Sequence, residues 1–235
     1  MGNGKLYLIP NFVYKGNKND ISINQLSIIY SITEFIVESE KVTRMFLKSI
    51  EHPVKQDNFM FHLYNEHNLN IVDFNEIFKN VKLGENIGLI SDAGIPCVAD
   101  PGSKVVEYAH KNNIKIVPMG GSSSIFLALM ASGMNGQQFT FNGYLPLDTS
   151  KRLKKLKSME KEVESSGTTQ IFMETPYRNN QLLEMLVKTL NSETVLFIAA
   201  GIHSPNQIFE RKKIKFWKNF KIDLNKIPTI FIIGN

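Results

Sequence analysis

The stretch LISDAGIPCVADPGS, residues 89–103, decides the fold of this chain because it joins an apolar run to a helix through a turn rich in glycine, proline and aspartate. The run before it, NIGLI (86–90), is typical of a strand buried in a parallel sheet. The run after it, SKVVEYAHKNN (103–113), predicts a helix, with Asp100 as its cap and Pro101 at its first position. The stretch therefore predicts a strand, a turn and a helix.

Strand and helix patterns alternate along the chain. Apolar runs typical of strands lie at 5–10, 35–38, 57–64, 86–90, 115–121, 168–176, 194–200 and 227–234. Patterns typical of helices lie within 23–34, 41–50, 68–84, 103–113, 122–133, 147–167 and 177–191. The helix at 122–133 is apolar on all sides, so we expect it to be buried. This order predicts an α/β protein with helices packed on mostly parallel sheets.

The composition is that of a folded protein. Of its 235 residues, 43% are hydrophobic, which is enough for one large or two small cores. The apolar run at 124–134 is shorter than the roughly 20 residues that span a bilayer, and residues 1–12 lack the apolar region of a signal peptide. We therefore expect a cytoplasmic protein with no membrane segment. The single cysteine, Cys97, excludes an internal disulfide framework, and we expect its side chain to pack.

Positive charge is concentrated in two segments of a chain whose net charge is +5. Residues 151–157 carry five positive charges, and residues 211–221 carry six, interleaved with Phe216, Trp217 and Phe220. Lysines beside aromatic rings are suited to RNA phosphates and unstacked bases. The same pattern also fits a solvated helix face and a surface strand, so both interpretations stay open.

The turn after the strand at 86–90 has the properties of a ligand site. Ligands of α/β proteins bind beyond the carboxyl ends of parallel strands. Gly94 would let a backbone approach closely, and the Asp92 carboxylate could accept from hydroxyl or ammonium groups. A tight turn and a helix cap would need the same residues, so a purely structural role is the alternative. Asp92 and Asp100 make a poor metal site because the residues between them supply no further oxygen side chains.

Several catalytic motifs are absent from the sequence. It has no G-x-x-x-x-G-K-[ST] and no G-x-G-x-x-G after a strand, which argues against a P-loop nucleotidase and an ordinary dinucleotide site. It has no G-x-S-x-G, and His62 and His67 do not have the spacing of a zinc protease.

The segment GLISDAGIPCVADPGSKVVEYA (88–109) resembles the S-D-A-G-x-P-x-x-x-D-P-G segment of the tetrapyrrole methylase superfamily, in its ribosomal RNA small subunit methyltransferase I branch. Similar segments follow in family order at 5–10, 114–134, 139–146 and 171–186. The resemblance implies two α/β domains, expected at 1–118 and 119–235, with S-adenosylmethionine in the cleft between them. It also implies a methyltransferase that acts as a homodimer in ribosomal RNA processing.

The resemblance also assigns roles to residues. The cofactor-binding positions that it implies are Asp92, Ala93, Gly94, Ile95, Val98, Ser123, Ser124, Met173, Ala200, Gly201, Pro228 and Thr229. A ribose hydroxyl needs a base or a strongly orienting partner. The catalytic candidates are Glu38, Arg44, Glu66, Glu174 and Arg178, with Asn65 and His67 beside Glu66. Each candidate could instead be a cap or an ion-pair partner, and Glu174 and Arg178, four apart, could pair with each other.

Departures from the family pattern leave the acceptor open. The first loop, PNFVYKGNKND (10–20), is longer than the family's P-T-P-x-G-N, VESEKVTR (37–44) replaces A-E-D-T-R, and IAAGIHS (198–204) replaces A-R-E. The ending IPTIFIIG (227–234) is nearer to that of tetrapyrrole methylases. Three functions are therefore compared: methylation of a ribose 2′-hydroxyl in small-subunit ribosomal RNA, methylation of a tetrapyrrole or other small acceptor, and cofactor binding without catalysis.

Overall fold

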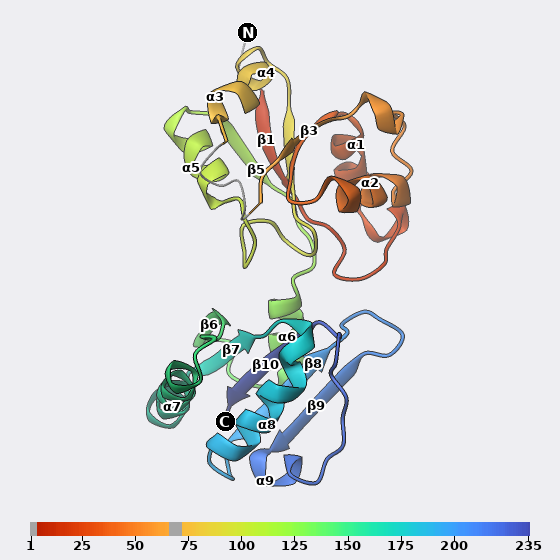
Figure 1. Ribbon diagram of the computed structural model, residues 1–235. Coiled ribbons are helices and arrows are strands. Elements are labelled where there is room, and N and C mark those ends of the chain that lie inside the picture. Colours follow the sequence, from red (N-terminus) through yellow and green to blue (C-terminus); the bar gives the residue numbers. More distant parts are fainter. Residues whose placement is uncertain (1–3, 66–71) are drawn as a thin grey trace. The chain divides into compact units, whose positions relative to one another are not determined.

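The computed structural model describes residues 4–65 and 72–235 (Figure 1). The chain folds as two compact units, Met1–Ser123 and Ser124–Asn235, and each unit has its own five-stranded sheet. Among the described residues, no helix combines the length and apolar character needed to cross a bilayer.

The first unit contains a parallel sheet with the strand order β3-β2-β4-β1-β5. Its strands are β1 (Lys5–Ile9), β2 (Glu34–Val37), β3 (Met60–Leu63), β4 (Ile87–Ile90) and β5 (Lys115–Pro118). Every residue of β2 and β4 is buried, as expected for central strands with helices on both faces. Gly88 of β4 lies beside Phe35, and a β-carbon there would come within 2.7 Å of the Phe35 ring.

Helices cover both faces of this sheet (Figure 1). One face carries α1 (Ile23–Tyr30) and α2 (Glu40–Ser49), and the other carries α3 (Phe74–Ile77), α4 (Lys79–Lys82) and α5 (Ser103–Lys111). Short 3₁₀ turns lie at Lys18–Asp20 and Gln56–Asn58. The prediction of a single helix within 68–84 is wrong for residues 72–84, the part that the structure describes. The chain bends at the fully buried Phe78 and forms the two short helices α3 and α4 instead.

The second unit contains a mixed sheet with the order β6-β7-β10-β8-β9. Its strands are β6 (Phe139–Tyr144), β7 (Thr169–Met173), β8 (Val195–Ala200), β9 (Ile208–Lys213) and β10 (Thr229–Gly234). Only β6 and β7 run parallel, and the other three pairings are antiparallel. The prediction of mostly parallel strands thus holds for the first sheet and is wrong for the second. The loop from β8 to β9 is too short for a parallel crossover, so the two strands form a hairpin.

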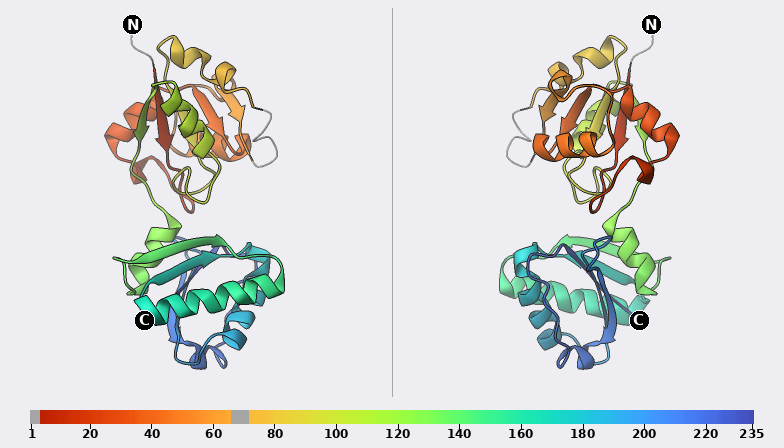
Figure 2. Two further views of the ribbon diagram at one scale, coloured as in Figure 1. Left: turned by 90° about the vertical axis from the view of Figure 1, so that its left-hand side faces the viewer. Right: turned by 90° about the vertical axis from the view of Figure 1, so that its right-hand side faces the viewer.

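Helices pack on both faces of the second sheet as well (Figure 2). Side chains of α7 (Thr149–Ser166), α8 (Asn179–Thr189) and α9 (Ile214–Trp217) share one core cluster with the sheet, and a 3₁₀ turn at Pro176–Arg178 precedes α8. α7 begins after the side-chain cap of Asp148 and ends at Gly167, whose φ of 70° is the left-handed conformation that glycine adopts readily.

The remaining helix, α6 (Ser124–Ser132), contacts β8, β9 and β10, and its buried residues lie outside that cluster. The prediction that α6 is wholly buried is wrong. Ile125, Ala128 and Leu129 are buried, but Phe126 is 50% exposed and Met130 is 78% exposed. One apolar side of α6 packs on the sheet of its own unit, and within the described residues of that unit Phe126 and Met130 on the helix stay exposed.

Candidate functional site

The turn that follows β4 is bound to the segment that follows β1. Asn11 and Gly94 exchange two backbone hydrogen bonds, of 2.9 and 3.1 Å. The buried side chain of Asn11 also donates to the carbonyl oxygens of Ser91 (3.2 Å) and Asp92 (3.1 Å). Within the turn, the Ser91 hydroxyl donates to the carbonyl of Gly94 at 2.6 Å. These bonds fix the backbone of residues 91–94, and Asn11 is a residue of this site that no motif in the sequence indicates.

The same turn packs against the segment that follows β5. Gly94 has a φ of +75°, and a β-carbon on it would lie 3.3 Å from the carbonyl oxygen of Ser122 and 3.9 Å from the α-carbon of Ser123. Ser123 is buried, and Ser124 begins α6. Three segments, following β1, β4 and β5, therefore meet at the carboxyl edge of three adjacent parallel strands. This edge is where parallel α/β sheets bind ligands.

Asp92 places an unsatisfied acceptor at this edge. Its Oδ1 atom is buried and has no hydrogen-bond partner among the described residues. Burial, reinforced by the nearby charge of Glu38, raises the pKa of Asp92 to about 6. A buried oxygen without a partner costs free energy, so such an atom in a native protein calls for an explanation. A ligand that donates a hydroxyl or ammonium hydrogen would supply the missing partner.

Asp100 takes a position different from the one predicted. The residue that caps α5 is Gly102, with a φ of 137°, and α5 begins at Ser103 without a side-chain cap. Cys97 and Ala99 also have positive φ, so the chain makes further turns before the helix begins. Asp100 lies instead beside Glu38, and burial together with the hydrogen bond between the two carboxyl groups raises the pKa of Asp100. The prediction that Asp100 caps α5 is therefore wrong. The carboxyl group of Asp100 pairs with that of Glu38 instead.

The other predicted residues of this turn differ in exposure. Ala93 and Val98 are exposed, whereas Ile95 is half-buried. Cys97 packs against the core cluster of α5, and burial raises its thiol pKa to about 11, so the prediction of a packing role is confirmed. Among residues 4–65 and 72–235, no group of three His, Cys, Asp or Glu side chains could hold a metal ion.

Five predicted cofactor positions lie together at one end of the second sheet. Met173 pairs with Ile230 across β7 and β10, and Ala200 pairs with Thr229 across β8 and β10. The amide of Gly201 donates to the carbonyl of Pro228 at 2.9 Å. The positions brought together are Met173, Ala200, Gly201, Pro228 and Thr229. Ala200 and Thr229 are buried, Met173 and Gly201 are half-buried, and Pro228 is exposed.

Glu174 follows directly after β7 and lies between two arginines. Its fully buried carboxylate is 3.1 Å from Arg152 Nη2 and 2.8 Å from Arg178 Nη2. It also accepts from the amide of Thr175 at 2.7 Å. The pairing of Glu174 with Arg178 is thus confirmed. Arg152 was not identified from the sequence, although it lies four residues before Leu156 and seven before Met159, on the buried side of α7.

The remaining catalytic candidates have different surroundings. Glu38 follows β2 and lies near Asp92 and Asp100. Arg44 of α2 pairs with Glu40 at 2.8 Å, and its guanidinium carbon lies 4.7 Å from the centre of the Phe61 ring. These contacts give Arg44 a local structural role. Glu66 and His67 lie outside the described residues.

The aromatic residues of 211–221 serve the core more than the surface. Trp217 is buried, and its ring N–H donates to the carbonyls of Leu196 (3.4 Å) and Lys212 (3.2 Å). Its indole therefore packs in the core instead of offering a face for base stacking. Phe220 is partly buried against the same core, whereas Phe216 is 59% exposed.

Comparisons with known proteins agree on a family. The model of the tetrapyrrole (corrin/porphyrin) methylases matches residues 16–215. A protein of Pasteurella multocida (strain Pm70) named ribosomal RNA small subunit methyltransferase I is 30% identical over 199 residues, which is 85% of this chain and 66% of that protein. The protein of the same name from Bacillus subtilis (strain 168) is 30% identical over 194 residues, covering 82% of this chain and 62% of its own length. This chain therefore spans less than two thirds of these relatives.

A solved structure supports the fold. The crystal structure of the methyltransferase CobJ matches 99% of this chain and 94% of its own, with a TM-score of 0.62 and 14% sequence identity. At that identity the likeness concerns the fold alone. Together with the family model, which covers most of the chain, it leads to one conclusion: this chain belongs to the tetrapyrrole (corrin/porphyrin) methylase family.

Proposed function

We propose that this protein is an S-adenosylmethionine-dependent methyltransferase that acts on a ribose 2′-hydroxyl of small-subunit ribosomal RNA. The observation that carries the proposal is the buried, unpartnered Oδ1 of Asp92, held at the carboxyl edge of a parallel sheet by Asn11. The choice of RNA as acceptor is supported by the name of the relatives, ribosomal RNA small subunit methyltransferase I.

The residues around Asp92 fit the proposed cofactor. Its unpartnered oxygen matches the hydroxyl and ammonium donors that S-adenosylmethionine carries. Gly94 has no side chain, which lets the turn that carries Asp92 pack closely against the backbone of Ser122 and the buried Ser123. When bound, the cofactor supplies a methyl group already activated by its sulfonium. The protein then has to hold the donor, orient the acceptor hydroxyl and accept its proton.

Glu38 is the preferred candidate for accepting the proton. The carboxylate of Glu174 is already engaged by two guanidinium groups and is fully buried, which suits an orienting role for Arg178 better than proton transfer. Glu38 has a carboxyl neighbour, Asp100, whose raised pKa favours its protonated form. A protonated Asp100 donates its O–H to Glu38 and fixes the orientation of that side chain.

We also propose a homodimer in the cytoplasm, with the outer side of α6 at the interface. Phe126 and Met130 are 50% and 78% exposed on a helix with no charged residue, and Phe126 contacts the ring of Phe139. A second copy of the chain would remove this apolar surface from water.

Calorimetric titration with S-adenosylmethionine and S-adenosylhomocysteine tests the cofactor site. The wild type is expected to bind both, and Asp92→Asn is expected to bind at least tenfold more weakly. Asp57→Asn, at an exposed aspartate, is the matched control and should bind like the wild type. A folded wild type that binds neither compound would contradict the proposal.

Transfer of labelled methyl groups tests the acceptor. Small-subunit particles, naked ribosomal RNA and a porphyrinoid are each incubated with the protein and labelled S-adenosylmethionine. Label in RNA, at a position resistant to alkaline cleavage, is the expected result because a methylated 2′-hydroxyl cannot attack the neighbouring phosphate. Label in the porphyrinoid alone would establish a small acceptor instead, and no label in any acceptor would leave cofactor binding without catalysis.

A further inference from the structure

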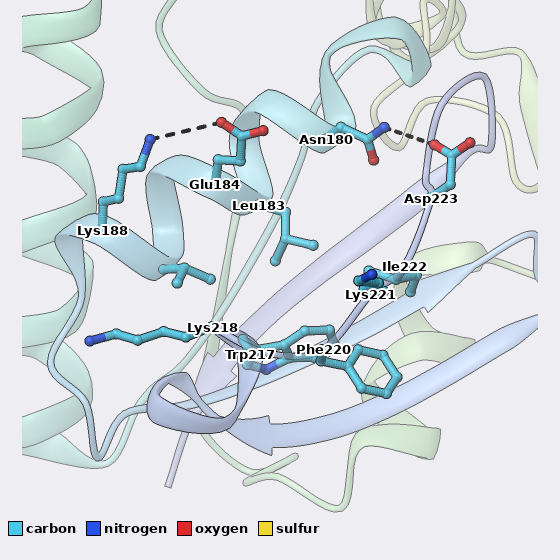
Figure 3. A pocket seen from close by; sticks show the side chains of 11 residues that line it. Asn180, Leu183, Glu184, Lys188, Trp217, Lys218, Phe220, Lys221, Ile222 and Asp223 are labelled. Carbon is cyan, nitrogen blue, oxygen red and sulfur yellow. Dashed lines mark hydrogen bonds and ion pairs between the residues drawn. The ribbon is translucent and has the colours of Figure 1, made fainter.

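A groove of about 640 Å³ runs between α8 and the segment that follows α9 (Figure 3). It lies entirely within the second unit, and none of its lining residues is among the predicted cofactor or catalytic positions. The residues that line it are Asn180, Leu183, Glu184, Val187, Lys188, Trp217, Lys218, Phe220, Lys221, Ile222 and Asp223. Its volume is within the usual range of sites for small ligands, roughly 300–1,000 Å³.

The floor of this groove is apolar. Leu183, Val187, Phe220 and Ile222 are partly buried against the core cluster of the second unit, so each keeps some apolar surface exposed. In Figure 3, Leu183 points from α8 toward Trp217 and Phe220. Such a floor can cover the face of a sugar or a base.

Three lysines of the basic segment already have acidic partners. Lys213 and Lys215 both bond the carboxylate of Glu193, at 2.8 and 2.7 Å, and hold the pKa of Glu193 well below its usual range. Lys212 pairs with Glu210. The positive charge of 211–221 is therefore partly neutralised, and none of these three lysines lines the groove.

The lysines that line the groove are different. Within the described part of the chain, neither Lys218 nor Lys221 has an acidic group within 4.0 Å, and both are exposed. Lys188, on α8, pairs with Glu184 only at 3.8 Å. The groove also contains Asp223, whose carboxylate accepts from the Asn180 side chain at 2.8 Å and is thereby turned toward α8.

We infer that this groove binds a short stretch of single-stranded RNA, with phosphates at Lys188, Lys218 and Lys221 and a sugar or base on the apolar floor. The inference rests on the proposed function, since the acceptor there is RNA. Lysines beside an apolar surface that includes an aromatic ring, here Phe220, are the combination that binds single strands without strict sequence preference. The groove belongs to the second unit, whereas Asp92 belongs to the first. The groove would therefore contribute to RNA affinity and not to methyl transfer itself.

The experiment compares two double variants of the full chain. Lys218→Glu with Lys221→Glu reverses the two unpaired charges, and Lys213→Glu with Lys215→Glu makes the same charge change at the lysines bound to Glu193. Fluorescence anisotropy with a labelled single-stranded RNA of small-subunit sequence measures affinity across a salt series. We expect the first variant to bind more than tenfold more weakly, with a salt slope smaller by about 2, and the second to bind within about threefold of wild type.

A second readout locates the RNA. Trp217 is the only tryptophan of the chain and lines the groove, so its emission should change when RNA binds to the wild type. Equal weakening by both variants, or no change in Trp217 emission at saturating RNA, would overturn the inference. Displacement of the RNA by poly-glutamate at equal charge concentration would also overturn it, in favour of an acidic peptide.

The outcomes distinguish a failure of the groove inference from a failure of the proposed function. If the wild type binds cofactor and methylates RNA while Lys218→Glu with Lys221→Glu behaves like the control variant, the groove inference fails and the function stands. If the wild type neither binds nor methylates RNA, both fail. Urea unfolding followed by Trp217 emission, which reports on the second unit, shows whether each variant keeps its fold.

Discussion

Arg152 and Glu174 form an ion pair that water barely reaches, with 3.1 Å between Nη2 and Oε2 and side chains that are 8% and 0% exposed. Arg152 comes from the buried side of α7, and Glu174 follows β7, so the pair joins a helix to the sheet it covers. Arg178 shares the same carboxylate and is 36% exposed. One carboxylate thus faces two guanidinium groups, so the cluster keeps a net positive charge. The buried Glu174 orients the partly exposed guanidinium of Arg178.

Removal of the carboxylate should destabilise the second unit. Glu174→Gln leaves the buried guanidinium of Arg152 without its counter-ion, and breaking a buried pair in this way costs about 3–5 kcal/mol. Urea unfolding followed by Trp217 emission reports on the same unit. The control is Glu184→Gln, whose pair with Lys188 is exposed on both sides and should contribute no more than about 1 kcal/mol. Equal midpoints for the two variants would show that the buried pair contributes little.

Asp92→Asn should separate stability from binding. The folded-state pKa of Asp92, about 6, lies above its ordinary value of 3.8, so the folded protein holds this proton more tightly than the unfolded chain. The stability of the ligand-free protein should therefore fall as pH rises from about 4 to about 6 and stay lower above that range. Asn cannot ionise, so the variant should be more stable than wild type by about 1–2 kcal/mol near neutral pH, after allowance for solvent screening.

Hydrogen exchange of the amides of β1 and β4 measures this difference locally. The gain in protection should vanish below about pH 3, where Asp92 is protonated in both states. A variant that is less stable than wild type at neutral pH would mean that the backbone hydrogen bond from Ser39 to the Asp92 carboxylate outweighs the cost of burying it. Cofactor affinity should change in the opposite direction, because the amide accepts donors less well than a carboxylate.

Gly94→Ala tests the close approach of the turn. Its φ of +75° strains any residue with a β-carbon, and the added carbon would lie 3.3 Å from the Ser122 carbonyl oxygen. We expect a loss of about 1 kcal/mol or more in stability and at least tenfold weaker binding of S-adenosylmethionine, measured by thermal unfolding and calorimetry. Gly136→Ala, at a glycine with open space around it and no positive φ, is the control and should change neither quantity. Tight binding by the Gly94 variant would contradict a role for this turn in the cofactor site.

The first unit could be predicted from sequence because its signals are local. The buried run before Asp92 predicted β4, and the alternation around it predicted the parallel sheet. β9 was anticipated only as the surface-strand interpretation of 211–221, because IFERKK is an edge strand whose alternate residues face solvent, so it lacks an apolar run. Without β9, the antiparallel character of the second sheet could not be inferred.

Two features of the site depend on contacts between distant segments. Asn11 is bound to residues 80 positions later, and no pattern near it indicates that contact. Asp100 has the sequence of a helix cap, D-P-G-S, but positive φ at Cys97 and Ala99 redirects it toward Glu38. Arg152, by contrast, could have been identified from its spacing to Leu156 on a single side of α7.

Met130→Lys should dissociate the proposed dimer. Met130 is 78% exposed on α6, close in sequence to the exposed Phe126, and an apolar side of a helix is stable in water when another surface covers it. A charge there would be buried at the interface without a partner, which is costly, so the dimer should become a monomer at micromolar concentration in analytical ultracentrifugation. The control is Ile23→Lys, which places the same charge on an apolar residue of α1 that is 81% exposed, and its sedimentation should match wild type. If wild type itself sediments as a monomer, the dimer proposal fails. If both variants remain dimeric, the interface lies elsewhere than on α6.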